Sequence, residues 1–516
     1  MTVSGRIEDH HMAKSIVANS ALNAAAGLSL LLIGFACSII TARLLGPEAN
    51  GIIAFSLWLA VTASLVAELG TGVMLLRLLP QLKSKGYTVA ERRGFAAYLL
   101  RPVIGSTLLL IAVYAAVFTL AEYEHWATST PVVVVITGAL FLIQSIGSSA
   151  KNYLLGEQQV GTFFRLSAIS GVLQLVGVAI GAVFFGIPGA LIGYTLGFAV
   201  QFTYAAGVLS VRANNCGISP RYLLGSSMLL SVQFIVDSIF LNRVEFFFLE
   251  RYSGVAVVGF YAAAMSLANL ALQLPVQLTG SLVPYYSETL QVHGGKTLPA
   301  AVFEAVVRNL SYITLPLSFG LAVIAPRLVS TIFGEAFAPA GPALAILALV
   351  TPVNVLGLIC TQYLFSLDRV RERLMISIVG AIAMVAGAFL VVPGYGAEGA
   401  AAVRFVVFAV MSALMMRRLT FERSLAELYW NLLRIALAAL ACAGVAWLVL
   451  IYVPGLAGLL LAIAAGALCY IVALRVFLAV AAEDRAVAEG IASRLPGAAG
   501  TAARRIVNLA FGRGAS

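Results

Sequence analysis

The stretch Ala42-Arg43-Leu44-Leu45-Gly46-Pro47-Glu48-Ala49-Asn50-Gly51 is a short polar joint between two long apolar runs. It returns in altered form 208 residues later, where Arg251, Gly254 and Gly259 repeat the frame Arg-x-x-Gly-x-x-x-x-Gly. Matches among leucine and alanine are common by chance in an apolar chain, so the arginine and the two glycines of this frame are the main evidence for a repeat. The joint therefore indicates an internal duplication.

A second set of repeated segments supports the duplication, because its offset of 210 residues is close to the 208 of the joint. Tyr153-Leu154 matches Tyr363-Leu364, and Gly186-x-x-Gly189-Ala190 matches Gly396-x-x-Gly399-Ala400, both at a shift of 210 residues. Transporters are often built from such repeats and bind their substrate at the interface between them.

The composition indicates an integral membrane protein. Of the 516 residues, 61% are hydrophobic and 10% are charged, whereas soluble domains carry about 25% charged residues. Apolar runs of about twenty residues recur, each long enough at ~1.5 Å per residue to cross a hydrocarbon core of ~30 Å. No long stretch remains for a soluble catalytic domain, and no P-loop is present, so we expect neither an enzyme nor direct ATP hydrolysis.

The five cysteines lie in or beside apolar runs without any CxxC or Cys/His grouping. Disulfide frameworks and metal sites are therefore not expected, and we expect no cofactor.

The apolar runs predict an all-α membrane bundle of about fourteen transmembrane helices. Two parallel six-helix lobes are expected to be related by a pseudo-two-fold axis, with two further helices at the C-terminal end. The predicted domains are an N-terminal lobe (1–211), a cytoplasmic linker (212–223), a C-terminal lobe (224–418), the extra helices (419–480) and a cytoplasmic tail (481–516).

Several helix limits depend on the apolar runs alone. We expect helix one at about 16–42, helix two at 52–76, helix three from 99, helix seven continuous over 224–249 and helix eight over 255–285. A basic loop with Lys83, Lys85, Arg92 and Arg93 is expected after helix two.

Lysine and arginine set the orientation, because positively charged loops stay in the cytoplasm. With both termini inside, cytoplasmic loops and helix ends hold 27 of the 32 basic residues. The remaining five are Arg43, Arg243, Arg251, Arg327 and Arg404. In the tail, Arg504 to Phe511 is compatible with a disordered segment or with a basic amphipathic turn on anionic lipid.

The joint at 42–51 closely resembles the opening of the polysaccharide flippase family in the MOP exporter superfamily. Similar motifs follow in order: Glu68-Leu69-Gly70, Val258-Gly259-Phe260-Tyr261, Leu315-Pro316-Leu317 and Ile332-Phe333-Gly334. Glu68 stands where an aspartate is more usual. The resemblance covers roughly residues 16–480.

The resemblance implies a flippase in the bacterial inner membrane. It would move polyprenyl-pyrophosphate-linked oligosaccharide to the outer leaflet for O-antigen (lipopolysaccharide), capsule or exopolysaccharide synthesis. A polysaccharide polymerase and export machinery are the expected partners, and nucleic acid is not. We expect a monomer, because two lobes can enclose a path without a partner.

Arginines are the candidate ligands of the pyrophosphate, since a guanidinium stays charged and binds phosphate oxygens in a bidentate way. Arg404 is the leading candidate because no other charge lies near it in an apolar helix, although it could instead reach for the membrane surface. Arg43, Arg251 and Arg243 are further candidates, with interfacial anchoring or pairing to nearby glutamates as the alternative. Arg327 is interpreted as an anchor.

Two polar features complete the predicted site. Asp237 is expected near the bilayer middle, where a carboxylate could couple a proton or sodium ion to transport or simply hydrogen-bond between helices. Asn269, Gln273 and Gln277 stand at i, i+4 and i+8, so they share a helix face. This row could contact sugar or join helices.

Two other transport functions remain open at this stage. A cation-coupled multidrug exporter of the same superfamily would favour carboxylates in the cavity, whereas the surplus charge here is positive. A flippase for the peptidoglycan lipid precursor would also have fourteen helices, but the form of the joint is closer to the polysaccharide branch.

Overall fold

The computed structural model describes residues 3–120, 131–221, 223, 232–279, 282, 286, 289–290, 299–421, 424–477, 484 and 501. For residues 3–26, 120, 274 and 278 the description covers the backbone alone. The predicted turn at Arg504 to Phe511 and the first residues of helix seven, 224–231, lie outside these ranges.

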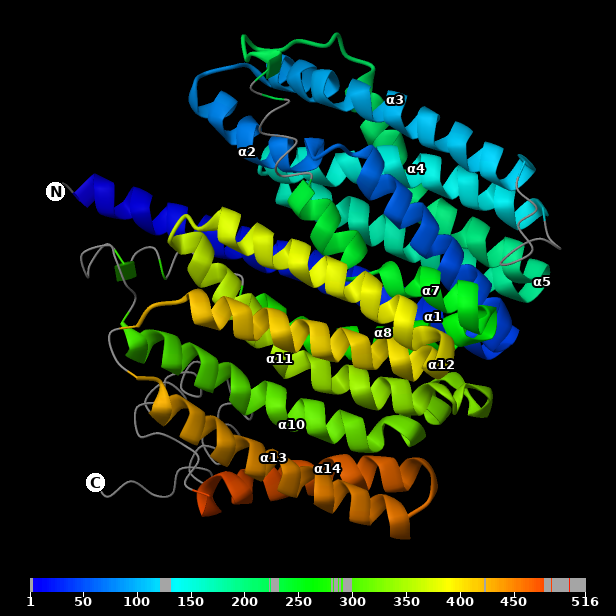
Figure 1. Ribbon diagram of the computed structural model, residues 1–516. Coiled ribbons are helices and arrows are strands. Elements are labelled where there is room, and N and C mark those ends of the chain that lie inside the picture. Colours follow the sequence, from blue (N-terminus) through cyan, green and yellow to red (C-terminus); the bar gives the residue numbers. More distant parts are fainter. Residues whose placement is uncertain are drawn as a thin grey trace. The chain divides into compact units, whose positions relative to one another are not determined.

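The described part of the chain is all-helical, which confirms the predicted fold class (Figure 1). The first half contains α1 (Val3–Ala67), α2 (Thr71–Ser84), α3 (Val89–Leu120), α4 (Pro131–Gly156), α5 (Val160–Leu209), a π-helical turn (Val236–Phe240) and α7 (Val244–Ser253). The second half contains α8 (Val255–Thr279), α10 (Ala300–Phe333), a 3-10 turn (Glu335–Phe337), α11 (Ala340–Ser366), α12 (Val370–Arg418), α13 (Ala426–Tyr452) and α14 (Gly455–Val476).

Ten of the described helices are long and apolar enough to cross a membrane. Three of the ten, α1, α5 and α12, are each two helices joined at a glycine with positive φ, namely Gly46, Gly186 and Gly396. A fourteenth crossing would include residues 224–231, so the count of fourteen stays a prediction.

Glycines that are 208 or 210 residues apart, the offsets of the sequence repeats, have similar backbone angles. Gly46 has φ 83° and ψ −179°, and its counterpart Gly254 has φ 87° and ψ 166°. Gly186 and Gly396, 210 residues apart, have φ 61° and 51° and ψ −136° and −130°. Only glycine adopts such angles without strain. Matched turns at matched positions support the duplication.

The chain divides into two compact units, and each is described by itself. One unit comprises residues 1–262 with 388–396, and the other comprises 263–387 with 397–516. In the first, α1 packs against α4 and α5, and α4 also packs against α2 and α3. In the second, α10 packs against α11 and α13, and α13 packs against α14 (Figure 1). The predicted division into six-helix lobes stays a prediction.

Helix two differs from the expected 52–76. It ends at Ala67, because Leu69 (φ 51°) and Gly70 (φ 70°) take left-handed angles that no helix continues through. The expected basic loop is also wrong in part, since Lys83 lies on α2 and Arg92 and Arg93 lie on α3. An apolar run shows where lipid lies, and helices can extend beyond it.

Helix three starts ten residues before the expected 99 because its N-terminus is capped. Thr88 Oγ1 accepts a hydrogen bond from the Glu91 N–H at 3.3 Å, while Glu91 Oε2 accepts one from the Thr88 N–H at 2.8 Å. This reciprocal capping box satisfies backbone donors that would otherwise lack partners. α1 likewise begins early, at Val3, before the expected residue 16.

The chain between α5 and the next helix is held against α3. The backbone N–H of Asn214 donates to the Gly94 carbonyl at 3.0 Å, and the Tyr87 hydroxyl donates to the Cys216 carbonyl at 3.1 Å.

The same region holds a buried ion pair, in which Arg92 and Glu157 form a bidentate contact with both N–O distances at 2.8 Å. Burial, with the Glu91 carboxylate as a smaller cause, raises the pKa of the Cys216 thiol.

Candidate functional site

Arg404 lies in the second segment of α12, eight residues beyond the break at Gly396, or roughly 12 Å along the helix. Only 6% of the residue is exposed. Its Nη1 lies 3.9 Å from the Met265 sulfur, and its guanidinium carbon lies 5.6 Å from the centre of the Phe408 ring. Both contacts are soft and weakly polar.

Met265 connects Arg404 to the predicted amide row on α8. Met265, Asn269, Gln273 and Gln277 are spaced by four residues, so they follow one side of that helix over about 18 Å. Asn269 and Gln277 are exposed and Gln273 is half-buried. Pro275, on the same helix, is buried. The structure thus brings a buried cation to one end of a row of amides, which the sequence could not show.

Of the other arginine candidates, Arg43, Arg243 and Arg251 belong to the first compact unit, whereas Arg404 and the amide row belong to the second. Arg43 and Arg251 are exposed, and each lies three residues before a positive-φ glycine. Their role at equivalent joints of the two halves stays a prediction. Arg327 donates from Nη1 to the Val453 carbonyl at 2.8 Å, at the C-terminal end of α13, and its role as an anchor stays a prediction.

Asp237 and Arg243 lie on either side of an unexpected break in helix seven. Asp237 is in the π-helical turn Val236–Phe240, and residues 241–243 form a turn before α7. Gln233 Nε2 donates to Asp237 Oδ2 at 3.2 Å, and Asn242 Nδ2 donates to the Asp237 carbonyl at 2.6 Å. The predicted continuous helix is therefore wrong, and π-helical turns are frequent at functional sites.

A glycine crossing, which sequence reasoning did not foresee, joins the repeated joints. A Cβ placed on Gly51 would collide with the Val255 carbonyl, and a Cβ on Gly259 would collide with the Pro47 carbonyl. Because Val255 and Gly259 lie 208 residues after Pro47 and Gly51, the two contacts are reciprocal. Only glycine allows the backbones to approach this closely.

Asn50 forms hydrogen bonds with both helices of this crossing. It is 3% exposed, accepts a hydrogen bond from the Thr41 hydroxyl at 3.1 Å, and donates from Nδ2 to the Gly259 carbonyl at 3.3 Å. A buried amide that lost these partners would be costly. The only signal in the sequence is the placement of an asparagine beside the repeated glycine.

A second buried ion pair lies on α10. Arg308 binds both carboxylate oxygens of Asp484, with an Nη2–Oδ1 distance of 2.6 Å, and the Tyr312 hydroxyl donates to Asp484 Oδ2 at 2.9 Å. The Tyr470 hydroxyl of α14 donates to the Tyr312 carbonyl at 2.9 Å. Asp484 follows the last predicted helix, and nothing in its local sequence pointed to this partner.

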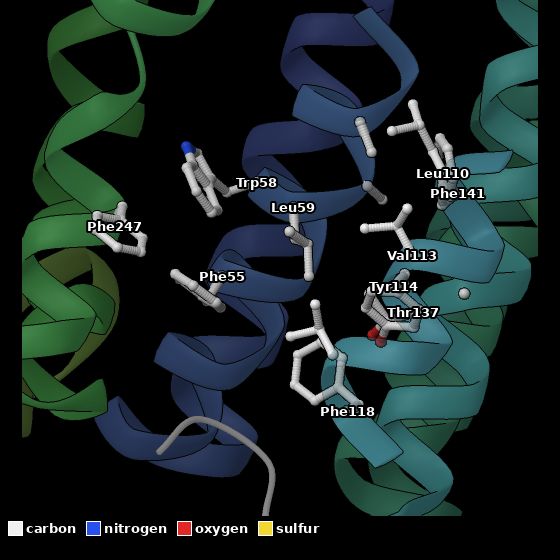
Figure 2. A pocket seen from close by; sticks show the side chains of 14 residues that line it. Phe55, Trp58, Leu59, Leu110, Val113, Tyr114, Phe118, Thr137, Phe141 and Phe247 are labelled. Atoms are coloured by element: carbon white, nitrogen blue, oxygen red, sulfur yellow. The ribbon is translucent and has the colours of Figure 1, made fainter. Parts of the chain in front are cut away.

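A cavity of about 340 Å³ opens among α1, α3, α4 and α7 (Figure 2). Its walls are nearly all apolar, and six of its fourteen lining residues are aromatic. They are Phe55, Trp58, Leu59, Ala60, Ala63, Leu110, Val113, Tyr114, Val117, Phe118, Thr137, Gly138, Phe141 and Phe247. Figure 2 shows Phe247 facing Phe55 and Trp58 across the gap.

A family model described as "Polysaccharide biosynthesis protein" matches residues 40–342, more than half of the chain. The chain belongs to this family. The matched region contains the repeated joint, the glycine crossing, the cavity and the amide row, whereas Arg404 lies beyond it. No curated protein sequence matches this family member.

Solved structures of three transport proteins are similar to this chain in fold. "Lipid II flippase MurJ, inward closed conformation" is similar with a TM-score of 0.70 at 13% identity, over 89% of this chain and 98% of that one. An inward-facing multidrug resistance MATE family transporter of the MOP superfamily is similar with a TM-score of 0.58 at 16% identity, over 76% and 96% of the two chains. A MOP superfamily transporter from Pyrococcus furiosus is similar with a TM-score of 0.56 at 16% identity, over 78% and 94%.

Proposed function

We propose that this member of the polysaccharide biosynthesis family flips polyprenyl-pyrophosphate-linked oligosaccharide from the cytoplasmic to the outer leaflet of the bacterial inner membrane. The observation that carries the proposal is the buried Arg404 at one end of the amide row on α8. Both termini would lie in the cytoplasm, and the protein would act as a monomer by alternating access.

The chemistry of this cluster fits the two parts of such a substrate. A guanidinium remains charged in a region of low dielectric and can hold two phosphate oxygens. Sugar hydroxyls that leave water need hydrogen-bond partners, and the amides of Asn269, Gln273 and Gln277 offer both donors and acceptors. Exposed amides cannot face lipid without cost, so their exposure favours an aqueous path over a role in joining helices.

The structural relatives support a lipid-linked anionic substrate more than a cationic drug. One relative is named as a flippase of Lipid II, another as a multidrug resistance transporter. The buried charge beside the amide row is positive, which would repel a cationic drug. The same features suit a peptidoglycan precursor, and the family of the chain favours a precursor of O-antigen, capsule or exopolysaccharide.

Asp237 is the proposed ion-coupling residue. It lies in a π-helical turn, and one of its carboxylate oxygens accepts from Gln233. Reshaping this turn during transport would change the surroundings of the carboxylate and hence its affinity for a proton or sodium ion.

The test compares lipid-linked glycan with surface glycan in a deletion strain of the source bacterium that carries wild-type or variant copies. Deletion is expected to remove surface glycan and to accumulate polyprenyl-pyrophosphate glycan on the cytoplasmic side. Arg404→Ala is expected to lower export at least about tenfold, because one charge-assisted hydrogen bond contributes about 1.5–3 kcal/mol. Arg404→Lys should recover part of the loss.

Arg327→Ala is the matched control, since it removes the same side chain from another apolar helix outside the cluster. Equal effects of Arg327→Ala and Arg404→Ala would mean that Arg404 acts only in folding. Intact surface glycan in the deletion strain, with altered sensitivity to cationic toxicants alone, would replace the proposal with drug export.

A further inference from the structure

The cavity among α1, α3, α4 and α7 presents no polar group to a ligand. The indole N–H of Trp58 donates to the Arg243 carbonyl at 2.6 Å, and the Tyr114 hydroxyl donates to the Val134 carbonyl at 2.8 Å. The Thr137 hydroxyl donates to the Val133 carbonyl at 2.8 Å. Since all three polar side chains of the wall are turned to the backbone, the cavity offers its occupant hydrocarbon surface only.

Three exposed apolar side chains form the mouth of the cavity. Val113, Val117 and Phe247 line it and are 51%, 41% and 41% exposed. Because α3 is long and apolar enough to cross a membrane, we expect lipid chains to meet this opening. At about 30 Å³ for each water-sized group, 340 Å³ holds roughly eleven carbon groups, or about two five-carbon isoprene units.

Hydrophobicity alone does not select among lipid chains, because a membrane is as apolar as the cavity. Packing and conformational entropy decide instead. An isoprenoid chain has a fixed double bond and a methyl branch in every unit, so it loses fewer rotations on binding than a saturated acyl chain of equal length. Stiff aromatic walls also keep their shape, as in the stack of Phe55 on Trp58 with ring centres 4.9 Å apart.

The cavity adjoins one of the predicted pyrophosphate ligands. The hydrogen bond from Trp58 joins its wall directly to the backbone of Arg243. In the predicted topology the cavity lies in the outer half of the membrane, since Phe118 and Thr137 lie near the outer ends of α3 and α4. It would thus receive the chain as the head group reaches the outer leaflet.

We infer that this cavity is a binding site for the isoprenoid chain of the lipid carrier. The inference rests on the proposed function, because it assigns the apolar part of the same substrate. The assignment can nevertheless be tested without transport.

The reporter is Trp58 itself. Full-length protein with Trp126, Trp430 and Trp447 replaced by phenylalanine is placed in nanodiscs of phosphatidylcholine with brominated acyl chains, which quench tryptophan on contact. Polyprenyl phosphate, and polyprenol without phosphate, are expected to displace the brominated chains and to raise Trp58 emission at least twofold. Palmitoleate at equal carbon content is expected to leave the emission unchanged.

The control reporter keeps Trp430 alone, which is 56% exposed on α13 and should stay quenched throughout. Two variants are designed to block the cavity. Ala63→Phe fills it, and Val113→Phe is a milder block at its mouth. Both should abolish the rise. Ala116→Phe makes the same exchange as Ala63→Phe at an exposed position of α3 outside the cavity and should preserve it.

No rise at Trp58, an equal rise with palmitoleate, or an equal rise at Trp430 would overturn the assignment. If these occur while deletion of the gene still accumulates lipid-linked glycan, only the cavity assignment fails. If glycan export persists without the protein, the proposed function fails, whatever the fluorescence shows.

Discussion

The glycine crossing between residues 47–51 and 255–259 predicts a specific pattern of instability. Replacing Gly51 by alanine would put a Cβ 2.8 Å from the Val255 carbonyl carbon, and alanine at Gly259 would put one 3.0 Å from the Gly51 nitrogen. Comfortable contacts between such atoms are about 3.5–4.0 Å. Each substitution must therefore push the two backbones apart by about 1 Å.

The cost has two sources. Overpacking of a close contact costs about 1–3 kcal/mol. The 3.3 Å hydrogen bond from Asn50 to the Gly259 carbonyl is already long, so a shift of this size breaks it and leaves a buried amide without that acceptor, for about 1–3 kcal/mol more. Gly51→Ala and Gly259→Ala should each destabilise the protein by about 2–5 kcal/mol.

The assay is unfolding of the purified protein in detergent, with the two single variants and the double variant compared. Because either methyl group separates the same two backbones, the double variant should lose much less than the sum of the single losses. Gly105→Ala and Gly320→Ala are matched controls, since open space surrounds both positions. They should be neutral or stabilising by up to about 1 kcal/mol. Additive losses, or controls as damaging as the crossing variants, would refute the reasoning.

Three further predictions concern buried polar groups. Glu157→Leu should cost about 3–5 kcal/mol of stability in the same unfolding assay, because it leaves the buried Arg92 guanidinium without its bidentate partner, and a cost below 1 kcal/mol would contradict this. Asp484→Ala should cost a similar amount through Arg308, whereas Tyr312→Phe should cost only about 1 kcal/mol; equal losses would contradict the ion pair as the main contributor. The raised pKa of Cys216 means that less thiolate is present near neutral pH, so maleimide labelling should be slower than that of a free cysteine and should increase as pH rises through that pKa. A labelling rate independent of pH would show that access alone controls this thiol.

The sequence predicted the features that depend on local chemistry. Glycines mark the breaks at Gly46, Gly186 and Gly396, because a positive φ has a recognisable residue preference. The break in helix seven has no such mark, since it falls at Leu241, Asn242 and Arg243 without glycine or proline. The capping box at Thr88 and Glu91 lies ahead of the apolar run, so hydropathy alone places the start of this helix too late.

The site was less predictable than the fold because it depends on packing between distant segments. Arg404 and the amide row could be selected separately as polar residues in apolar helices. Their connection through Met265 spans 139 residues and follows from how α8 meets α12. The cavity was not foreseen at all, since its lining residues read individually as ordinary lipid-facing or core positions.

The reciprocity of the glycine crossing also has a consequence for the origin of the chain. Gly51 meets Val255 and Gly259 meets Pro47, with 208 residues between each residue and its counterpart. In a homodimer of a half-length ancestor, both contacts would be one and the same isologous contact, seen from each subunit. Fusion of two genes would have preserved this contact while freeing its halves to diverge, so that Asn50 now stands where the second copy has Val258.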